Sequence, residues 1–271
     1  MNSESSDEKK IEVGEGPLPF GDLVEVSEDG KKTRHRGVYL LPNLFTTGAL
    51  FCGFYAIVSA MNGNFSHAAL AIFAAMLLDG MDGRVARMTN TQSAFGEQFD
   101  SLADMVSFGV APALVMFTWA LHDMGRWGWA ASFIYMACAA LRLARFNTQI
   151  GVVDKKHFIG LASPAAAALV TAIVWVWFDE HINRSWSYLV AVITALSGFL
   201  MVSNFKYTSF KSVNFRQVPF GYLLLVVVIF ALLIRFQEVG VLTMAVIYAL
   251  SAPIIWLIHK VLDKKKSSPV Q

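Results

Sequence analysis

The chain has 271 residues, of which 55% are hydrophobic and 15% charged, with a mean hydropathy of +0.50 and a net charge of +2. Soluble proteins carry roughly 25% charged residues, so this composition excludes a soluble globular domain and indicates a polytopic membrane protein. The net charge of the whole chain does not indicate any class of partner. We expect no nucleic-acid partner.

Residues 1–37 are polar and mixed in charge, with Gly, Pro and Ser scattered through them. We expect a flexible cytoplasmic tail here. A basic cluster directly precedes the first apolar segment and consists of Lys31, Lys32, Arg34, His35 and Arg36. It is typical of a positive-inside determinant, and contact with anionic lipid head groups is compatible with that role.

Eight apolar segments follow, at about 44–62, 66–87, 97–121, 127–145, 161–178, 187–203, 219–235 and 239–259. They predict an all-α membrane domain of eight helices over residues 38–262, followed by a basic cytoplasmic tail over 263–271. The second to fourth segments reach the roughly 20 residues of a membrane span only with their charged ends included. Those charged ends therefore project toward one water interface.

Lysines and arginines set the orientation of these helices. With the N-terminus inside, 19 of the 22 fall on the inner side, and only Arg126, Arg184 and Arg235 fall on the outer side. The positive-inside rule then places both termini in the cytoplasm. In a bacterial-type cell this predicts an integral protein of the cytoplasmic membrane.

Asn43 and Thr46 stand at the start of the first segment, three residues apart and so on one face of a helix. Pro42 and Asn43 are consistent with a helix start in which the asparagine is the N-cap. A ligand-contacting role for the same two polar residues is an equal and compatible alternative.

Where the second and third segments meet, residues 79–104 carry two arginines, Arg84 and Arg87, and four aspartates, Asp79, Asp82, Asp100 and Asp104. A charged residue at the centre of a membrane helix costs about 2.5–3.5 kcal/mol, so six such groups need partners. Carboxylates that cannot neutralise one another need a cation. The stretch therefore predicts a metal site at the membrane edge.

The spacing of the carboxylates supports this interpretation. Asp79 and Asp82 are three residues apart and Asp100 and Asp104 four, so each pair shares one helix face. The polar residues 88–95 are short enough to join two antiparallel helices, which would set the pairs opposite each other. Gly83 and Gly96 would let a second backbone or a ligand approach. All-oxygen ligation suits Mg²⁺, Mn²⁺ or Ca²⁺, which characteristically bridge substrate phosphates.

At these residues the chain resembles a known family. Asp79-x-x-Asp82-Gly83-x-x-Ala86-Arg87, eight residues, and Gly96-x-x-x-Asp100-x-x-x-Asp104 are similar to the complete signature of the CDP-alcohol phosphotransferases. The resemblance implies a six-helix core, here with two further C-terminal helices, and homodimers are usual in the family. A pair of helices with buried ion pairs is the structural alternative.

The resemblance also implies roles for individual residues. Asp79, Asp82, Asp100 and Asp104 would hold Mg²⁺ or Mn²⁺, in two ions, and Asp104 would be the catalytic base. The nucleotide side of the site would be formed by Asn43, Thr46, Gly83, Ala86, Arg87 and Gly96. The substrate would be CDP-diacylglycerol, with its acyl chains among membrane lipids and CMP as the leaving group.

Arg142 and Arg145 are three residues apart at the inner end of the fourth segment. Their stems could simply reach toward the water interface, or their guanidinium groups could bind a carboxylate or phosphate. A loop then leads to Ser163, where the fifth helix is expected to begin with Pro164 in its first turn.

Three stretches, RLARFN, FxGLxSPAAA and SNFKYTSFK, resemble the phosphatidylserine synthase branch of the family over roughly residues 41–211. The residue before Ser163 is Ala162 where that branch usually has proline. This resemblance implies L-serine as the acceptor, with Arg142, Arg145 and Ser163 near the acceptor or the lipid phosphate. Glycerol 3-phosphate, inositol phosphate or choline remain alternative acceptors, and a cation transporter is the alternative from another class.

Overall fold

The computed structural model describes residues 25–26, 32–33, 40–89, 94–149, 157–180, 183–208 and 237–266. Its α-helices are α1 (Leu40–Met61), α2 (Phe65–Thr89), α3 (Ala94–Asp104), α4 (Ala111–Met116), α5 (Arg126–Gln149), α6 (Ser163–Trp177), α7 (Arg184–Val202) and α9 (Gln237–Lys266). The π-helix η1 (Met105–Val110) joins α3 to α4, and the π-helix η2 (Phe117–Leu121) and the 3₁₀-helix η3 (His122–Met124) continue this helical run beyond α4. The antiparallel strand pairs are β1 (Glu25–Val26) with β2 (Lys32–Thr33) and β3 (His157–Ile159) with β4 (Lys206–Thr208).

The all-α membrane class predicted from the sequence is confirmed. Seven helical runs correspond to the first six and the eighth of the predicted segments, and the seventh, 219–235, lies outside the described residues. The predicted N-cap at Asn43 is wrong, because α1 begins at Leu40 and Asn43 lies within its first turn. The strand pair β3–β4 was not predicted, since its two strands are almost 50 residues apart and no local pattern marks their pairing.

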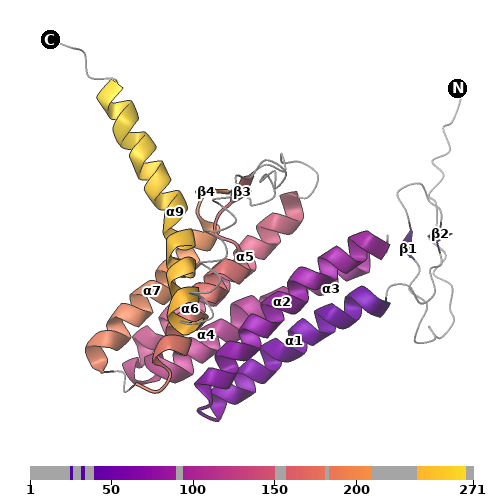
Figure 1. The fold of residues 1–271 in the computed structure, drawn as a ribbon, viewed down its shortest axis with the longest axis horizontal. Coiled ribbons are helices and arrows are strands. Elements are labelled where there is room, and N and C mark those ends of the chain that lie inside the picture. The colour runs from indigo at the N-terminus through magenta and orange to yellow at the C-terminus, as the bar shows by residue number, and fades with distance from the viewer. Residues whose placement is uncertain are drawn as a thin grey trace, which may run out of the picture.

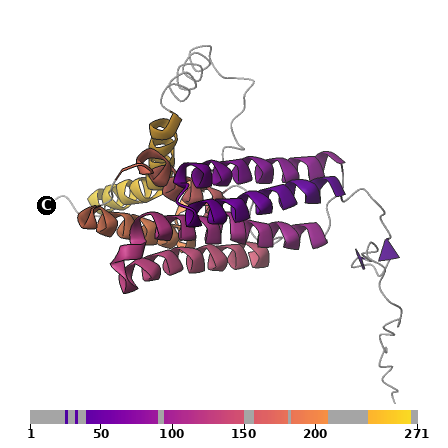
Figure 2. The ribbon, with the colours of Figure 1, turned by 90° about the horizontal axis from the view of Figure 1, so that it is seen from below.

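The helices form a bundle in which α1 and α2 lie side by side (Figure 1). The α3–α4 run and α5 continue the bundle beside them (Figure 2). Helix α7 packs on α5, and α9 packs on α6, with the C-terminal end of α9 projecting away from the other helices. The ladder β3–β4 joins the loop before α6 to the segment after α7.

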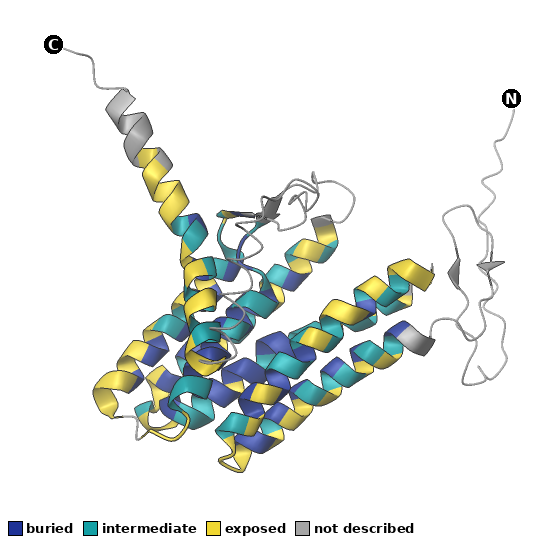
Figure 3. Cartoon of the chain, in the orientation of Figure 1, coloured by how far each residue is buried: buried dark blue, intermediate teal, exposed yellow. Residues whose placement is uncertain are grey.

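Four helical stretches are long and apolar enough to cross a membrane: Pro42–Met61, Phe95–Met124, Arg184–Val202 and Gln237–Ile258. Large apolar side chains cover their outer faces, among them Phe51, Phe54, Leu196, Phe199 and Ile254, all about half or more exposed. In Figure 3 such exposed positions alternate with the buried face that each helix turns inward. Apolar side chains on the outside and small residues inside are the arrangement of a bundle surrounded by lipid, so the chain is an integral membrane protein.

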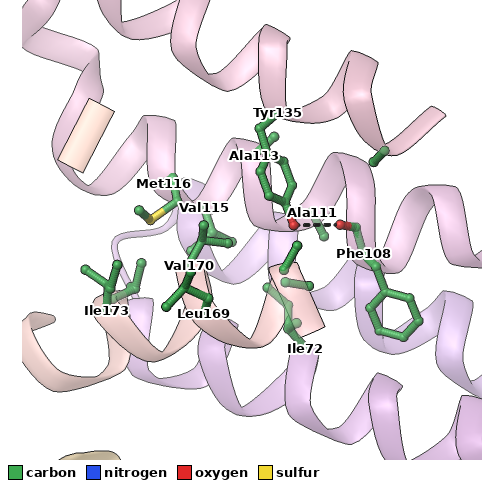
Figure 4. Close-up of a cluster of buried hydrophobic side chains, with 14 of the residues drawn as sticks. Ile72, Phe108, Ala111, Ala113, Val115, Met116, Tyr135, Leu169, Val170 and Ile173 are labelled. Atoms are coloured by element: carbon green, nitrogen blue, oxygen red, sulfur yellow. Dashed lines mark hydrogen bonds between the residues drawn. The ribbon is translucent and has the colours of Figure 1, made fainter. Parts of the chain in front are cut away.

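The buried core lies where α2, the α3–α4 run, α5 and α6 meet (Figure 4). Ile72, Phe108, Met116 and Val170 are fully buried there. Tyr135 is also fully buried, and its hydroxyl donates a 3.0 Å hydrogen bond to the Phe108 carbonyl in η1. This bond satisfies a polar group that would be costly inside the core and fixes α5 against the helical run that follows the aspartates.

Two glycines allow helices to approach closely. A Cβ at Gly53 would lie 2.8 Å from Ser107 Oγ and 2.9 Å from Ser107 Cα, where α1 meets η1. Ser107 itself donates a 3.0 Å hydrogen bond to the Ala49 carbonyl of α1. A Cβ at Gly198 would lie 3.0 Å from Tyr135 Cα, where α7 meets α5. The close approach at Gly53 and the hydrogen bond of Ser107 therefore hold α1 against η1, one turn beyond Asp104.

The segment that leads into α6 depends on a third glycine. Gly160 has a φ of +82°, and a Cβ there would lie 2.3 Å from the Met201 carbonyl oxygen. The amides of Gly160 and Leu161 donate hydrogen bonds to the carbonyls of Phe205 (2.8 Å) and Leu200 (2.9 Å). This connection sets Ser163 at the first position of α6, with Pro164 in the same turn.

Candidate metal and nucleotide site

The four aspartates of the sequence motif come together between α2 and α3. Carboxylate oxygens of Asp79, Asp82 and Asp100 all lie within 4.8 Å of one another. Asp104, the last residue of α3, lies near Asp79, and Asp100 lies near Asp82. The two helices thus face each other with their carboxylate pairs, one pair from each.

Electrostatics make this cluster unstable without a counter-charge. Asp82 is buried and the other three aspartates are partly buried, so water screens their repulsion poorly. Like charges this close cannot all remain ionised unless a proton or a cation neutralises them. Among the described residues, no arginine or lysine forms an ion pair with these carboxylates at 4.0 Å or less.

The donor set fits a hard divalent cation. Three carboxylates converge, and the Oδ1 atom of Asp100 is buried without a hydrogen-bond partner among the described residues. A buried carboxylate oxygen without a partner is costly, and a cation would satisfy it. Oxygen-only ligation of this kind is what Mg²⁺ and Mn²⁺ prefer.

Helix α1 completes the environment of Asp82. The buried Thr46 hydroxyl donates a 2.8 Å hydrogen bond to Asp82 Oδ2, and the same hydroxyl oxygen lies 3.2 Å from the Pro42 carbonyl oxygen. The backbone amide of Gly83 also donates to Asp82 Oδ1. Both donors orient the carboxylate, so Thr46 contacts a candidate metal ligand directly, a relation that the sequence did not predict.

The remaining nucleotide candidates lie on α2 and α3, which carry the aspartates, and on α1. A Cβ at Gly80 or Gly83 would meet no atom within 4 Å among the described residues. The sequence left open whether Gly83 admits a second backbone or a ligand, and this open space favours a ligand. Ala86 and Arg87 follow on the last turns of α2, with Arg87 exposed. The partly buried Gly96 precedes Asp100 by one turn of α3, and Asn43 is partly buried near the start of α1.

Arg142 reaches the cluster from α5. Its side chain interacts electrostatically with Asp104, and one terminal nitrogen donates a 2.8 Å hydrogen bond to the hydroxyl of the fully buried Ser163. Its Nε atom is buried without a hydrogen-bond partner among the described residues. Arg142 and Ser163 therefore form a hydrogen-bonded pair, and its arginine interacts electrostatically with the last aspartate.

Arg145 points elsewhere, although it stands only three residues away. Its guanidinium donates to the Asn204 side-chain oxygen at 2.9 Å and to the Val202 carbonyl at 3.4 Å. These bonds connect α5 to the end of α7. The structure thus separates two arginines that the sequence treated as one pair.

Two further polar contacts near the site were not predicted. Ser101 of α3 and Asn147 of α5 are hydrogen-bonded at 3.1 Å, which ties the two helices together beside Asp100. Tyr248 of α9 interacts electrostatically with Arg142. Its only sequence signal is a polar tip in an apolar helix, which does not distinguish it from a tyrosine at the membrane surface.

Residues 39–202 match the family model described as CDP-alcohol phosphatidyltransferase. The chain belongs to the CDP-alcohol phosphatidyltransferase family. The match covers α1 to α7 and includes all four aspartates, while α9 lies beyond it. The aspartate cluster is therefore the candidate active site of a family member, and the family is metal-dependent in general.

Several relatives in the family carry one name, CDP-diacylglycerol–serine O-phosphatidyltransferase. The Helicobacter pylori (strain J99) protein is 38% identical over 236 residues, which cover 85% of this chain and 98% of the relative. The Bacillus subtilis (strain 168) protein is 34% identical over 171 residues, covering 63% of this chain and 91% of the relative. A crystal structure of Mycobacterium tuberculosis phosphatidylinositol phosphate synthase with CDP-DAG bound matches with a TM-score of 0.45 at 20% identity, covering 61% of this chain and 80% of that one.

Proposed function

We propose that this protein transfers the phosphatidyl group of CDP-diacylglycerol to L-serine and releases phosphatidylserine and CMP. The observation that carries the proposal is the convergence of Asp79, Asp82 and Asp100 beside Asp104 in a chain of this family. Serine as the acceptor is supported by the name of the Helicobacter pylori relative, which matches nearly end to end.

Asp79, Asp82 and Asp100 would be the primary ligands of a divalent metal, Mg²⁺ or Mn²⁺, and Asp104 would share a second ion. When bound, such ions neutralise the diphosphate of the substrate and stabilise the leaving CMP. Two observations support this assignment: the Oδ1 atom of Asp100 has no hydrogen-bond partner among the described residues, and two donors hold Asp82.

The cytidine end of the substrate lies along the α1–α2 side of the cluster. Gly83 leaves open space for it, and Ala86 and Arg87 continue that surface along α2. Asn43 and Thr46 of α1 and Gly96 of α3 form the remaining edges of this nucleotide surface. The acyl chains remain among the membrane lipids that surround the bundle.

Asp104 is the general base. Its carboxylate takes the proton of the serine hydroxyl as the serine oxygen forms its bond to the phosphorus on the lipid side of the diphosphate. The bond from that phosphorus to the oxygen of CMP breaks, and CMP leaves with the electron pair. The Arg142 guanidinium interacts electrostatically with Asp104.

Arg142 and Ser163 bind the acceptor, because they adjoin Asp104 and Arg142 keeps donor capacity beyond its bond to Ser163. An arginine binds a carboxylate well, and serine carries one. The same guanidinium could instead bind the lipid phosphate. The effect of an Arg142 substitution on the KM for serine and on the KM for CDP-diacylglycerol decides between these two roles. Arg145, bonded to Asn204 and Val202, holds the end of α7 in place instead.

The site faces the cytoplasm and the protein resides in a bacterial-type cytoplasmic membrane with both termini inside. The excess of lysine and arginine on one side of the predicted helices supports this orientation. A cytoplasmic site has access to cytidine nucleotides. We also expect a homodimer, a prediction that rests on the family resemblance alone.

The test is an assay of purified protein in detergent with CDP-diacylglycerol, radiolabelled L-serine and Mg²⁺ or Mn²⁺. We expect labelled phosphatidylserine and an equal amount of CMP, and no product with excess chelator until the metal is restored. Glycerol 3-phosphate, inositol phosphate and choline are offered in parallel reactions. Product from one of them and none from serine would refute the acceptor, and full activity in chelator would refute the metal site.

A further inference from the structure

The helical run changes its winding immediately after Asp104. Helix α3 ends at Asp104, and the next six residues, Met105–Val110, form the π-helix η1. Asp104 has helical backbone angles, with a φ of −58° and a ψ of −43°, so the run is continuous through the proposed base. Short π-helical turns within α-helices are frequent at functional sites. Because the run is continuous, the position of η1 determines that of Asp104.

Helix α1 holds η1 and the metal-binding side of the site at once. Ser107 lies three residues after Asp104, is fully buried, and donates a 3.0 Å hydrogen bond to the Ala49 carbonyl of α1. Thr46 lies three residues before Ala49 and so on the same face of α1. Its hydroxyl donates a 2.8 Å hydrogen bond to Asp82. A single turn of α1 is therefore bonded both to a candidate metal ligand and to the run that carries the proposed base.

Helix α5 holds η1 at the adjacent residue. The fully buried Tyr135 donates a 3.0 Å hydrogen bond to the carbonyl of Phe108, which follows Ser107 (Figure 4). Arg142 lies seven residues further along α5, two turns away and on the same face, and it donates a 2.8 Å hydrogen bond to Ser163. The bond of Tyr135 therefore sets the height and rotation of the helix that carries the proposed acceptor arginine.

These two bonds do more than satisfy a buried hydroxyl. The buried Thr194 and Ser197 donate to carbonyls four residues earlier in their own helix, α7. A bond within one helix cannot fix that helix against another. The hydroxyls of Ser107 and Tyr135 instead join different elements, across 58 and 27 residues of the chain. They meet η1 at two consecutive residues, so two helices are referenced to the same short segment.

We propose that Ser107 and Tyr135 are positioning residues: Ser107 sets Asp104 against the metal-binding aspartates through α1, and Tyr135 sets it against the acceptor site through α5. The inference rests on the proposed function, because it takes Asp104 as the base and Arg142 as an acceptor-binding residue. A misplacement of about 1 Å at a reacting group can cost about 10²-fold in rate. The two residues should therefore affect different steps, metal binding in one case and acceptor binding in the other.

The experiment compares Ser107→Ala and Tyr135→Phe in the full-length protein. Each substitution removes a hydroxyl and keeps the rest of the side chain. We expect Ser107→Ala to raise the Mg²⁺ concentration at half-maximal activity about 5-fold, with the KM for serine unchanged. Tyr135→Phe should raise the KM for serine about 5-fold, with the Mg²⁺ requirement unchanged. A general loss of stability would not separate the two quantities in this way.

Ser197→Ala and Tyr207→Phe are the matched controls. Ser197 is also buried, but its hydroxyl donates to a carbonyl of its own helix, α7. Tyr207 is fully buried, like Tyr135, and its 2.9 Å hydrogen bond joins β4 to α9. Both controls should keep the wild-type Mg²⁺ requirement and KM for serine, although Tyr207→Phe should lower the melting temperature. Neither quantity depends on how much of a preparation is folded, so partial misfolding does not obscure the outcome.

Changes of both quantities together in both variants would overturn the inference, because they would show a general loss of packing. So would wild-type values of both quantities in either variant. These results leave the proposed function intact, provided that the wild type in the same preparation makes phosphatidylserine. A wild type that uses no serine, or that is fully active in excess chelator, would instead overturn the proposed function itself.

Discussion

The hydroxyl of Thr46 on α1 donates a 2.8 Å hydrogen bond to the carboxylate of Asp82 on α2, and both residues are buried. The bond connects the first helix of the bundle to the aspartate cluster. It holds Asp82 in the orientation in which its oxygens approach those of Asp79 and Asp100. A residue predicted from the sequence to contact the nucleotide therefore also positions a candidate metal ligand.

Replacing Thr46 with valine should weaken metal binding, because valine has the same shape and no donor. A hydrogen bond to a charged group contributes about 1.5–3 kcal/mol, so we expect the Mg²⁺ or Mn²⁺ requirement to rise at least about 10-fold. A metal titration of activity measures this. Thr46→Ser keeps the donor and should restore most of the affinity.

Thr47→Val is the control for this substitution. Thr47 is the next residue, is exposed, and donates its hydroxyl to the Asn43 carbonyl within α1. Its metal requirement should match that of the wild type. Equal metal requirements in Thr46→Val and Thr47→Val would show that the Thr46 bond does not position Asp82 for a metal.

Asp104→Asn should remove turnover while leaving nucleotide binding largely intact. The amide cannot accept the serine proton, and general-base catalysis contributes about 10²–10⁴-fold to a rate. Turnover and CDP-diacylglycerol binding are measured on the same preparation. Asp123→Asn, at a fully exposed side chain in η3, is the control, and retained turnover in Asp104→Asn would exclude this residue as the base.

Gly53→Ala and Gly83→Ala should fail in different ways. At Gly53 a Cβ would lie 2.8 Å from Ser107 Oγ and 2.9 Å from Ser107 Cα. Such overpacking costs about 1–3 kcal/mol, so the melting temperature should fall. At Gly83 the added methyl group meets open space within the described residues, so the melting temperature should hold while affinity for CDP-diacylglycerol drops. Unchanged affinity in Gly83→Ala would remove this glycine from the nucleotide surface.

Arg142→Ala and Arg145→Ala should also be distinguishable. Arg142 adjoins Asp104 and Ser163, so its loss should raise the KM for serine. Arg145 holds Asn204 and the Val202 carbonyl at the end of α7, so its loss should lower the melting temperature with little change in that KM. An unchanged KM for both acceptor and lipid in Arg142→Ala would exclude Arg142 from substrate binding.

The sequence determined the class of the protein and the elements that carry the aspartates. Apolar composition requires a lipid-embedded bundle, and the i,i+3 and i,i+4 spacings place each carboxylate pair on one face of its helix. These are local properties, since they depend on a few consecutive residues and the helical period. The strand pair β3–β4 escaped prediction for the same reason, because its pairing is set by residues far apart in the chain.

Only the tertiary structure decided which polar residues meet. Thr46 bonds Asp82 across 36 residues and Arg142 bonds Ser163 across 21. Arg145, on nearly the same face of α5 as Arg142, turns to the end of α7 instead. Tyr207 of β4 bonds the Ala249 carbonyl of α9 across 42 residues. Such contacts depend on how whole helices pack, and packing is fixed by the fit of buried side chains from distant segments, which no short stretch of sequence contains.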